Sequence, residues 1–235
     1  EINNFLEQIS EDSTIIDNIY SKLKLDTDNN KKTEIIEEIE EKCNIIDTEI
    51  NNIDDILENS VHGHLNAKRQ IKRIIGQWIN GADSGYCFGF EGPPGIGKTS
   101  LAKLGLSKCL QDDENNPRPF SFIALGGQSD SSLFEGHSYT YEGSHWGRII
   151  DILIDSKCMN PVIYFDELDK VSDTHKGDEI IHMLTHLTDP SQNSLFQDNY
   201  YPGVNIDLSK VLFIFSFNDE SKINRILKDR MYVIN

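Results

Sequence analysis

Residues 86–100, which read YCFGFEGPPGIGKTS, decide the fold of this chain. The apolar run 86–90 is typical of a buried parallel strand, and the Gly/Pro segment after it cannot continue regular structure. From residue 98 onward the sequence favours a helix. The loop between strand and helix matches G-x-x-x-x-G-K-T and comprises Gly92, Pro93, Pro94, Gly95, Ile96, Gly97, Lys98, Thr99 and Ser100. In this context the pattern predicts a phosphate-binding loop.

The residue types of this loop suit the phosphates of a nucleotide. Glycines let successive backbone N–H groups turn inward as an anion-binding nest, and the helix N-terminus adds partial positive charge. We expect Lys98 to reach the β- and γ-phosphates and the Thr99 hydroxyl to bind Mg²⁺. The alternative is a Gly/Pro turn that matches by chance, and the flanking strand and helix argue against it. ATP and Mg²⁺ are therefore the expected cofactors.

The charge of the chain is negative and unevenly distributed. The 235 residues carry a formal net charge of −17, and residues 1–60 hold 17 Asp and Glu against 5 Lys and Arg. Nonspecific nucleic-acid binding depends on neutralising phosphates with Lys and Arg, so a nucleic-acid partner is not expected. The acidic N-terminal segment is interpreted as a solvated helical face.

Cysteine usage and hydropathy bear on the compartment. The four cysteines are scattered without a C-x-x-C pair, which favours reduced thiols in the cytoplasm or another reducing compartment. No apolar run approaches the length of a membrane span, so no membrane partner is expected. The chain opens at Glu1 without Met, which suggests an excised segment whose targeting signal, if present upstream, would not be visible.

Residues 1–59 form a helical pattern that differs from the rest of the chain. One apolar stripe contains Ile16, Ile19 and Leu23, and the polar segment 26–30 interrupts it. A second stripe follows steps of three and four residues and contains Ile36, Ile39, Cys43, Ile46, Ile50, Ile53 and Leu57. These stripes predict an acidic arm, either a helical hairpin or a coiled coil, over 1–59, and a second domain over 60–235.

Four further apolar runs, at 120–125, 161–165, 211–215 and 231–234, are typical of strands. Helical patterns alternate with them. The expected fold is therefore α/β, a P-loop NTPase with a parallel five-stranded sheet covered by helices on both faces.

Polar residues follow two of these strands. Asp166 and Glu167 end the run at 161–165, and Asn218 comes just after the run at 211–215. We expect Asp166 to hold Mg²⁺ directly or through water, and Glu167 to orient and deprotonate the attacking water. Asn218 is placed to hydrogen-bond that water or the γ-phosphate. The alternative is that these residues are only polar strand ends without a function. The phosphate-binding loop upstream argues against it.

A series of short motifs gives the sequence a specific resemblance. In order these motifs are GG at 126–127, FEGH at 134–137, TYEG at 140–143, GRII at 147–150, DELDK at 166–170, GD at 177–178, DPSQN at 189–193, DLSKVLFI at 207–214 and DRM at 229–231. They resemble the ATPase module of Lon-type ATP-dependent proteases. The similar part is the large subdomain of that AAA+ module, over about residues 57–235. The lid subdomain and the protease domain of the family have no counterpart in this chain.

The resemblance assigns roles to further residues. It implies that Arg230 is an arginine finger acting on nucleotide bound by a neighbouring subunit. Tyr141 resembles the pore-loop aromatic that grips an unfolding polypeptide, although its neighbour Glu142 stands where the family usually has an aliphatic residue. His62 and Gly63 lie where the family places an aromatic and a glycine near the adenine ring.

Structural alternatives remain for two of these residues. Without the resemblance, Arg230 beside Lys228 reads as an exposed basic turn. Tyr141 has the alternative of packing under its own loop with Tyr139 and Trp146.

A helical His pair, His182 and His186, has the i, i+4 spacing of a metal site. No Glu follows His182 as H-E-x-x-H requires, so a surface or hydrogen-bonded pair is the better interpretation.

The resemblance implies an ATP-hydrolysing unfoldase motor of a Lon-like protease. Its expected partners are copies of itself in a ring, a hexamer in the full-length protein, and unfolded or misfolded proteins as substrates. One alternative is a stand-alone AAA+ remodeller or chaperone without a peptidase. A third hypothesis is an ATP-gated scaffold that assembles through the arm and hydrolyses little.

Overall fold

The computed structural model describes residues 44, 48, 50–79, 87–111, 116–128, 130–171 and 174–234. Within them, five strands form one sheet in the order β2-β3-β4-β1-β5, and every pairing is parallel. The strands are β1 (Cys87–Glu91), β2 (Phe120–Ala124), β3 (Val162–Asp166), β4 (Leu212–Phe217) and β5 (Tyr232–Ile234). The predicted α/β fold with a parallel five-stranded sheet is confirmed, and each strand lies within two residues of its predicted bounds.

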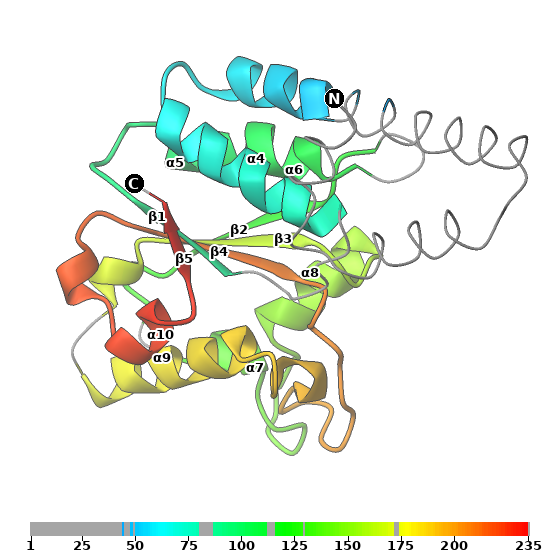
Figure 1. Ribbon diagram of the computed structural model, residues 1–235. Helices are drawn as coiled ribbons and strands as arrows, with labels where there is room; N and C mark the ends of the chain where they lie inside the picture. Colours follow the sequence, from blue (N-terminus) through cyan, green and yellow to red (C-terminus); the bar gives the residue numbers. More distant parts are fainter. Residues whose placement is uncertain are drawn as a thin grey trace, which may run out of the picture.

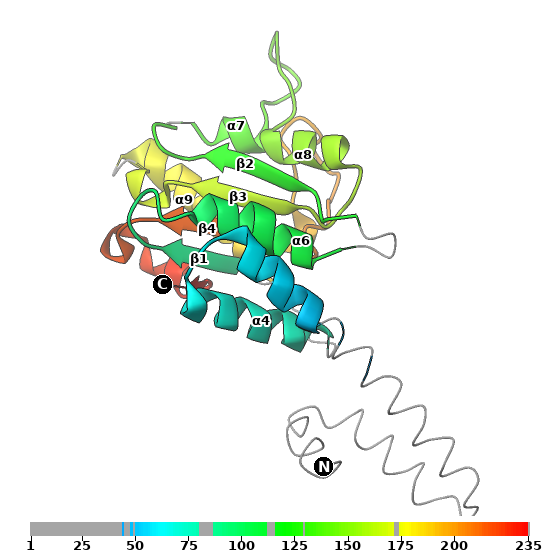
Figure 2. The same ribbon diagram turned by 90° about the horizontal axis from the view of Figure 1, so that it is seen from above.

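Helices cover both faces of the sheet (Figures 1 and 2). One face carries α4 (Leu65–Ile79) and a continuous helix over 98–109, which consists of α5 (Lys98–Ser100), the π-helical η1 (Leu101–Leu106) and α6 (Ser107–Cys109). The other face carries α7 (Ser132–Glu135), α8 (Arg148–Ser156), α9 (His175–Thr188) and α10 (Arg225–Lys228). Short 3₁₀ turns, η2 (Leu168–Lys170), η3 (Asn193–Leu195) and η4 (Glu220–Lys222), lie in the connections. Crossover helices are the usual way to join parallel strands.

The apolar strands fill two cores because alternate side chains of a strand point to opposite faces. On the α4 face, Phe88, Tyr164 and Ile214 pack with buried residues of α4 and of the 98–109 helix. On the opposite face, Phe165 and Phe215 stack with ring centroids 4.9 Å apart and belong to the core beneath α8 and α9. Burial on both sides explains why these strands are continuously apolar.

A helix over 50–60 precedes α4 and packs against the α4 face of the sheet domain. Ile53 and Leu57 are 4% and 1% exposed and belong to the core on the α4 face. A side chain at Gly105 would lie 3.2 Å from Leu57 Cδ2, so this glycine permits the close approach of the two helices. The last turns of the predicted arm are therefore part of this packing. The domain boundary at 59/60 stays a prediction, and most of the arm, including Ile16 to Cys43, lies outside the described residues.

No helix in the described ranges has the length and apolar character needed to cross a bilayer.

Candidate nucleotide site

Three neighbouring strands bring the predicted site residues together. Because β3, β4 and β1 are adjacent and parallel, their carboxyl ends meet at one edge of the sheet. Ligands of open α/β sheets bind at that edge. An open cleft of about 1100 Å³ lies there, lined by Pro94, Gly95, Gly97, Lys98, Thr99, Ser100, Asp166, Glu167, Lys170, Ser216, Phe217 and Asn218. The structure thus gathers residues from three distant parts of the sequence into one cleft.

The phosphate-binding loop has a backbone that needs its glycines. Gly92, Gly95 and Gly97 have φ values of 147°, 82° and 95°, a region that side chains disfavour. At Gly92 a Cβ would also lie 2.5 Å from Ile96 Cδ1, and at Gly97 it would lie 3.2 Å from Val61 Cγ1. The spacing of glycines seen in the sequence therefore reflects both backbone conformation and the close packing of Ile96 and Val61 against the loop.

Lys98 is held in the cleft by acceptors from two strand ends. Its ammonium donates to the carbonyl of Gly92, to the carbonyl of Pro93 at 3.3 Å and to Asn218 Oδ1 at 3.0 Å. Partial burial lowers the pKa of Lys98, and the Asp166 and Asp169 carboxylates act in the opposite direction. The group is a cation whose contacts include loop carbonyls, the kind of contact that an anionic phosphate oxygen can replace.

Asp166 and Glu167 point to different partners. Asp166 accepts a hydrogen bond from the Ser216 hydroxyl, and Glu167 forms an ion pair with Lys170. Glu167 has φ 60°, an uncommon left-handed conformation for a residue with a side chain. Such backbone outliers concentrate at functional sites. A Cβ at Gly126 would lie 2.1 Å from Glu167 Oε2, so Gly126 makes room for this carboxylate.

Two hydroxyl groups that sequence reasoning missed lie beneath the cleft. Thr99 Oγ1 donates to the hydroxyl of Tyr164 at 3.3 Å, and Ser216 donates to Asp166. Tyr164 and Ser216 are buried within β3 and β4. A hydroxyl in an otherwise apolar strand beside the predicted site is the signal that could have identified them.

A smaller pocket, with about 310 Å³ of empty space, adjoins the loop. Its lining residues are His64, Ala67, Phe90, Glu91, Ile96, Gly97, Lys98, Leu101 and Ile234. His64 Nε2 lies 2.9 Å from the Ile96 carbonyl oxygen, whereas His62 is exposed and is not among the residues that line this pocket. His62 and Gly63 therefore stay a prediction, and His64 is the histidine that contacts the phosphate-binding loop.

Comparison with known proteins agrees with this geometry. The model of the ATPase family associated with various cellular activities (AAA) matches residues 88–235, more than half of the chain. The chain belongs to this family.

Relatives of this AAA ATPase include Lon proteases. A Lon protease homolog of Acanthamoeba polyphaga mimivirus is 42% identical over 184 residues, which are 77% of this chain and 17% of the relative. The Lon protease of Campylobacter jejuni is 48% identical over 61% of this chain and 17% of its own length. A mitochondrial Lon protease homolog of Homo sapiens is 38% identical over 77% of this chain and 18% of its own length. The chain thus spans less than a fifth of these relatives, in a nucleotide-binding AAA+ module of the Lon type.

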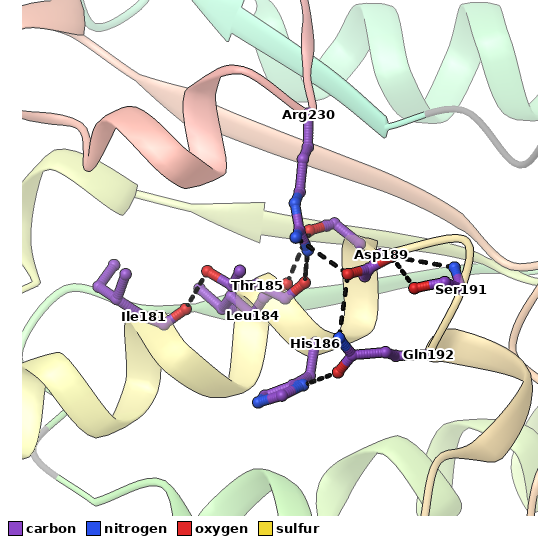
Figure 3. A network of polar contacts seen from close by, with 9 residues as sticks. Ile181, Leu184, Thr185, His186, Asp189, Ser191, Gln192 and Arg230 are labelled. Carbon is purple, nitrogen blue, oxygen red and sulfur yellow. Dashed lines mark hydrogen bonds and ion pairs between the residues drawn. The ribbon is translucent and has the colours of Figure 1, made fainter.

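In this AAA ATPase, Arg230 lies outside the cleft and is anchored in its own subunit (Figure 3). Its guanidinium donates to the Thr185 carbonyl near the end of α9, and to Asp189 Oδ2 at 2.9 Å. Hydrogen bonds from Ser191, together with Arg230, lower the pKa of Asp189. The side chain of Arg230 is 28% exposed, whereas that of Arg225 is 92% exposed. Arg230 is therefore an ordered, half-buried group, unlike the exposed basic residue beside it.

His186, the second residue of the His182/His186 pair, lies in the same network. Its ring nitrogen contacts the side-chain oxygen of Gln192, and the side-chain nitrogen of Gln192 donates to Asp189 (Figure 3).

Tyr141 lies at the surface of a projecting segment. The segment 136–147 connects α7 to α8 and extends away from the sheet (Figure 2). Tyr139 and Tyr141 are 62% and 69% exposed, and Glu142 is exposed. Trp146 packs elsewhere, stacked on Tyr201 with a centroid distance of 6.2 Å. The alternative in which Tyr141 packs beneath its loop is therefore not the arrangement that the structure has.

The neck of this segment is the part around Gly147, where the segment joins α8. It is fixed by a carboxylate that sequence reasoning also missed. Asp198 is 1% exposed and accepts hydrogen bonds from the backbone N–H groups of Gly147 and Tyr200, both at 2.8 Å. A Cβ at Gly147 would lie 2.0 Å from the Phe134 carbonyl oxygen. The neck is thus closely packed, whereas Tyr139 and Tyr141 further along the segment are exposed.

Proposed function

We propose that this module binds and hydrolyses MgATP and drives the unfolding and threading of protein substrates in a Lon-like ATP-dependent protease. The convergence of Lys98, Asn218, Asp166 and Glu167 in one cleft is the observation that carries the ATPase part. The protease part of the proposal rests on the relatives, which are named Lon proteases. It does not rest on this chain itself, because the chain spans only a small share of those proteins.

The residues of the cleft have complementary chemistry for phosphoryl transfer to water. Lys98 would neutralise the β- and γ-phosphates, and the loop glycines would present backbone N–H groups to them. Thr99 and Asp166 supply the oxygen ligands that Mg²⁺ prefers, and the bound ion would offset charge on the phosphate oxygens. Glu167 would accept the proton of the attacking water, while Asn218 would orient that water or the γ-phosphate.

Two further roles extend the proposal beyond one subunit. Arg230, held outside the cleft by Asp189, would act on nucleotide in a neighbouring copy of a ring, which we propose to be a hexamer. The exposed ring of Tyr141 would bind unfolded or misfolded polypeptide through apolar contact, whatever the sequence of that polypeptide. His62 and Gly63 are proposed to lie near the adenine. A stand-alone remodeller, and a scaffold with little turnover, are the competing functions.

Replacement of Lys98 tests the nucleotide site. Lys98→Ala should lower MgATP affinity at least tenfold in titration calorimetry, because a bound phosphate loses its charge partner. Lys103→Ala is the matched control, since Lys103 is exposed on the same helix and outside the cleft. Equal affinity of the wild-type protein and Lys98→Ala would refute the proposed binding mode.

A further inference from the structure

Two hydroxyl side chains lie inside the sheet beneath the cleft. Tyr164 is fully buried in β3, and Ser216 is 1% exposed in β4. Apart from Asp166, the other residues of these two strands are apolar. A buried hydroxyl is unfavourable unless it is hydrogen-bonded, so the partners of these two groups indicate why they are tolerated there.

The two hydroxyls connect Thr99 to Asp166. Thr99 Oγ1 donates to the Tyr164 hydroxyl at 3.3 Å, and Ser216 donates to Asp166 Oδ1. The Ser216 hydroxyl also interacts with the Tyr164 hydroxyl. An ionised carboxylate only accepts hydrogen bonds, so Asp166 ends this row. The Thr99 proton is directed to Tyr164 and the Ser216 proton to Asp166, so the Ser216 oxygen can only accept from Tyr164.

We infer that Tyr164 and Ser216 are positioning residues that orient Thr99 and Asp166 as ligands for the divalent cation bound with the nucleotide. This inference rests on the proposed binding of Mg²⁺ in the cleft. A hydroxyl binds a cation through an oxygen lone pair, so its proton must point away from the ion. Tyr164 accepts that proton and leaves the Thr99 oxygen free to face the cleft. Groups that orient metal ligands in this way commonly affect metal affinity strongly.

Ser216 orients Asp166, the second proposed ligand of the cation. It occupies Oδ1 of Asp166, so Oδ2 is the oxygen left to face the cation or a water bound to it. A tyrosine hydroxyl is protonated at neutral pH, so Tyr164 can both accept from Thr99 and donate. The row of hydrogen bonds therefore sets the orientation of both ligands at once.

The ring of Tyr164 is positioned independently of its hydroxyl. It lies 5.8 Å from the ring of Phe120 and 5.9 Å from that of Phe122, measured between centroids. In the sheet register Tyr164 lies opposite Ile214, which places Ser216 two residues further along β4 on the same face. Tyr164→Phe should therefore keep the packing and remove only the hydrogen bonds.

The test measures how much Mg²⁺ strengthens nucleotide binding. ATP affinity is determined in the intact protein by titration calorimetry, once with EDTA and once with saturating Mg²⁺, in a Glu167→Gln background to prevent turnover. We expect Tyr164→Phe to leave the affinity in EDTA within twofold and to reduce the Mg²⁺-dependent gain about tenfold. Ser216→Ala should reduce the same gain from the other end of the row. Tyr201→Phe removes a hydroxyl from the ring that stacks on Trp146, remote from the cleft. It should change neither the affinity in EDTA nor the Mg²⁺-dependent gain.

The outcomes separate this inference from the proposed function. If Mg²⁺ does not strengthen ATP binding in the background protein, the proposed Mg²⁺ site is wrong and the inference is overturned with it. If the gain is present in the background protein and unchanged in both Tyr164→Phe and Ser216→Ala, the site stands and the positioning role is wrong. Equal losses of affinity with EDTA and with Mg²⁺ would show that the hydroxyls maintain the fold of the loop, which also overturns the inference.

Discussion

The nucleotide cleft and the Tyr141 segment differ in how their functional side chains are held. In the cleft, Lys98 is fixed by Asn218 and Asp166 by Ser216, with each partner on a different part of the chain. In the Tyr141 segment only the neck is fixed, by the buried Asp198, and the Tyr141 ring is 69% exposed. Chemistry on a phosphate requires donors and acceptors that are already in place, whereas contact with a passing polypeptide requires a side chain that it can reach.

This difference leads us to expect separable defects. Substitutions in the cleft should change nucleotide binding or turnover, and substitutions in the segment should change work on protein substrates.

Arg230 belongs to neither region and tests whether the cleft is complete in one subunit. Removal of an arginine finger should lower turnover about a thousandfold or more, so Arg230→Ala should show that loss in steady-state phosphate release. If the residue acts on a neighbouring copy, mixing Arg230→Ala with Lys98→Ala subunits should restore some activity. Wild-type activity per subunit should also rise with protein concentration. A concentration-independent rate without rescue on mixing would contradict the role.

Glu167 tests the chemistry of the cleft. Glu167→Gln removes the proposed base and keeps the size of the side chain, so turnover should fall at least a hundredfold while MgATP affinity stays within threefold. Phosphate release and calorimetry measure the two quantities. Glu179→Gln, an exposed position on α9, provides the same chemical change away from the cleft. Turnover within threefold of the wild-type rate would assign the base to another group.

Tyr141 tests the other side of the comparison. In the intact protein Tyr141→Ala should stop the unfolding of a folded, tagged substrate and leave ATP hydrolysis within about twofold, because the exposed ring lies outside the cleft. Glu142→Ile should maintain or improve unfolding by adding an apolar neighbour. Joint loss of ATPase activity and thermal stability in Tyr141→Ala would indicate packing instead of substrate contact.

Asp198 tests whether the neck controls the segment. Asparagine has one side-chain acceptor oxygen, so Asp198→Asn must leave the Gly147 or the Tyr200 N–H without its partner. We expect a loss of about 1–3 kcal/mol in unfolding free energy. Chymotrypsin should cleave faster at Tyr139 and Tyr141, with MgATP affinity unchanged.

The control for this prediction is Asp207→Asn. Asp207 makes a similar turn, accepting from the Ser209 N–H at 2.9 Å, but it is exposed. Its replacement should not alter cleavage at Tyr139 and Tyr141. Equal cleavage of Asp198→Asn and the wild-type protein would show that the neck does not depend on the carboxylate.

The features of this protein that depend on local chemistry could be predicted from its sequence. Only glycine suits the positive φ values at Gly92, Gly95 and Gly97, so the loop is recognisable from its spacing. Continuous apolar runs identify strands buried on both faces, and a polar residue at the end of such a run marks the sheet edge where ligands bind. The fold and the cleft residues Lys98, Thr99, Asp166, Glu167 and Asn218 were therefore predictable, while the AAA+ family was predicted from the resemblance of the short motifs.

Which distant groups support those residues depends on how the elements pack in three dimensions. Tyr164 and Ser216 become partners because β3 and β4 are adjacent in register, and Asp198 reaches Gly147 from 51 residues away. The anchoring of Arg230 on Asp189 likewise needs α9 and β5 to be placed in space. Such pairings have no fixed spacing in the sequence, because they depend on strand order and on packing between elements. They arise only when the sheet is assembled.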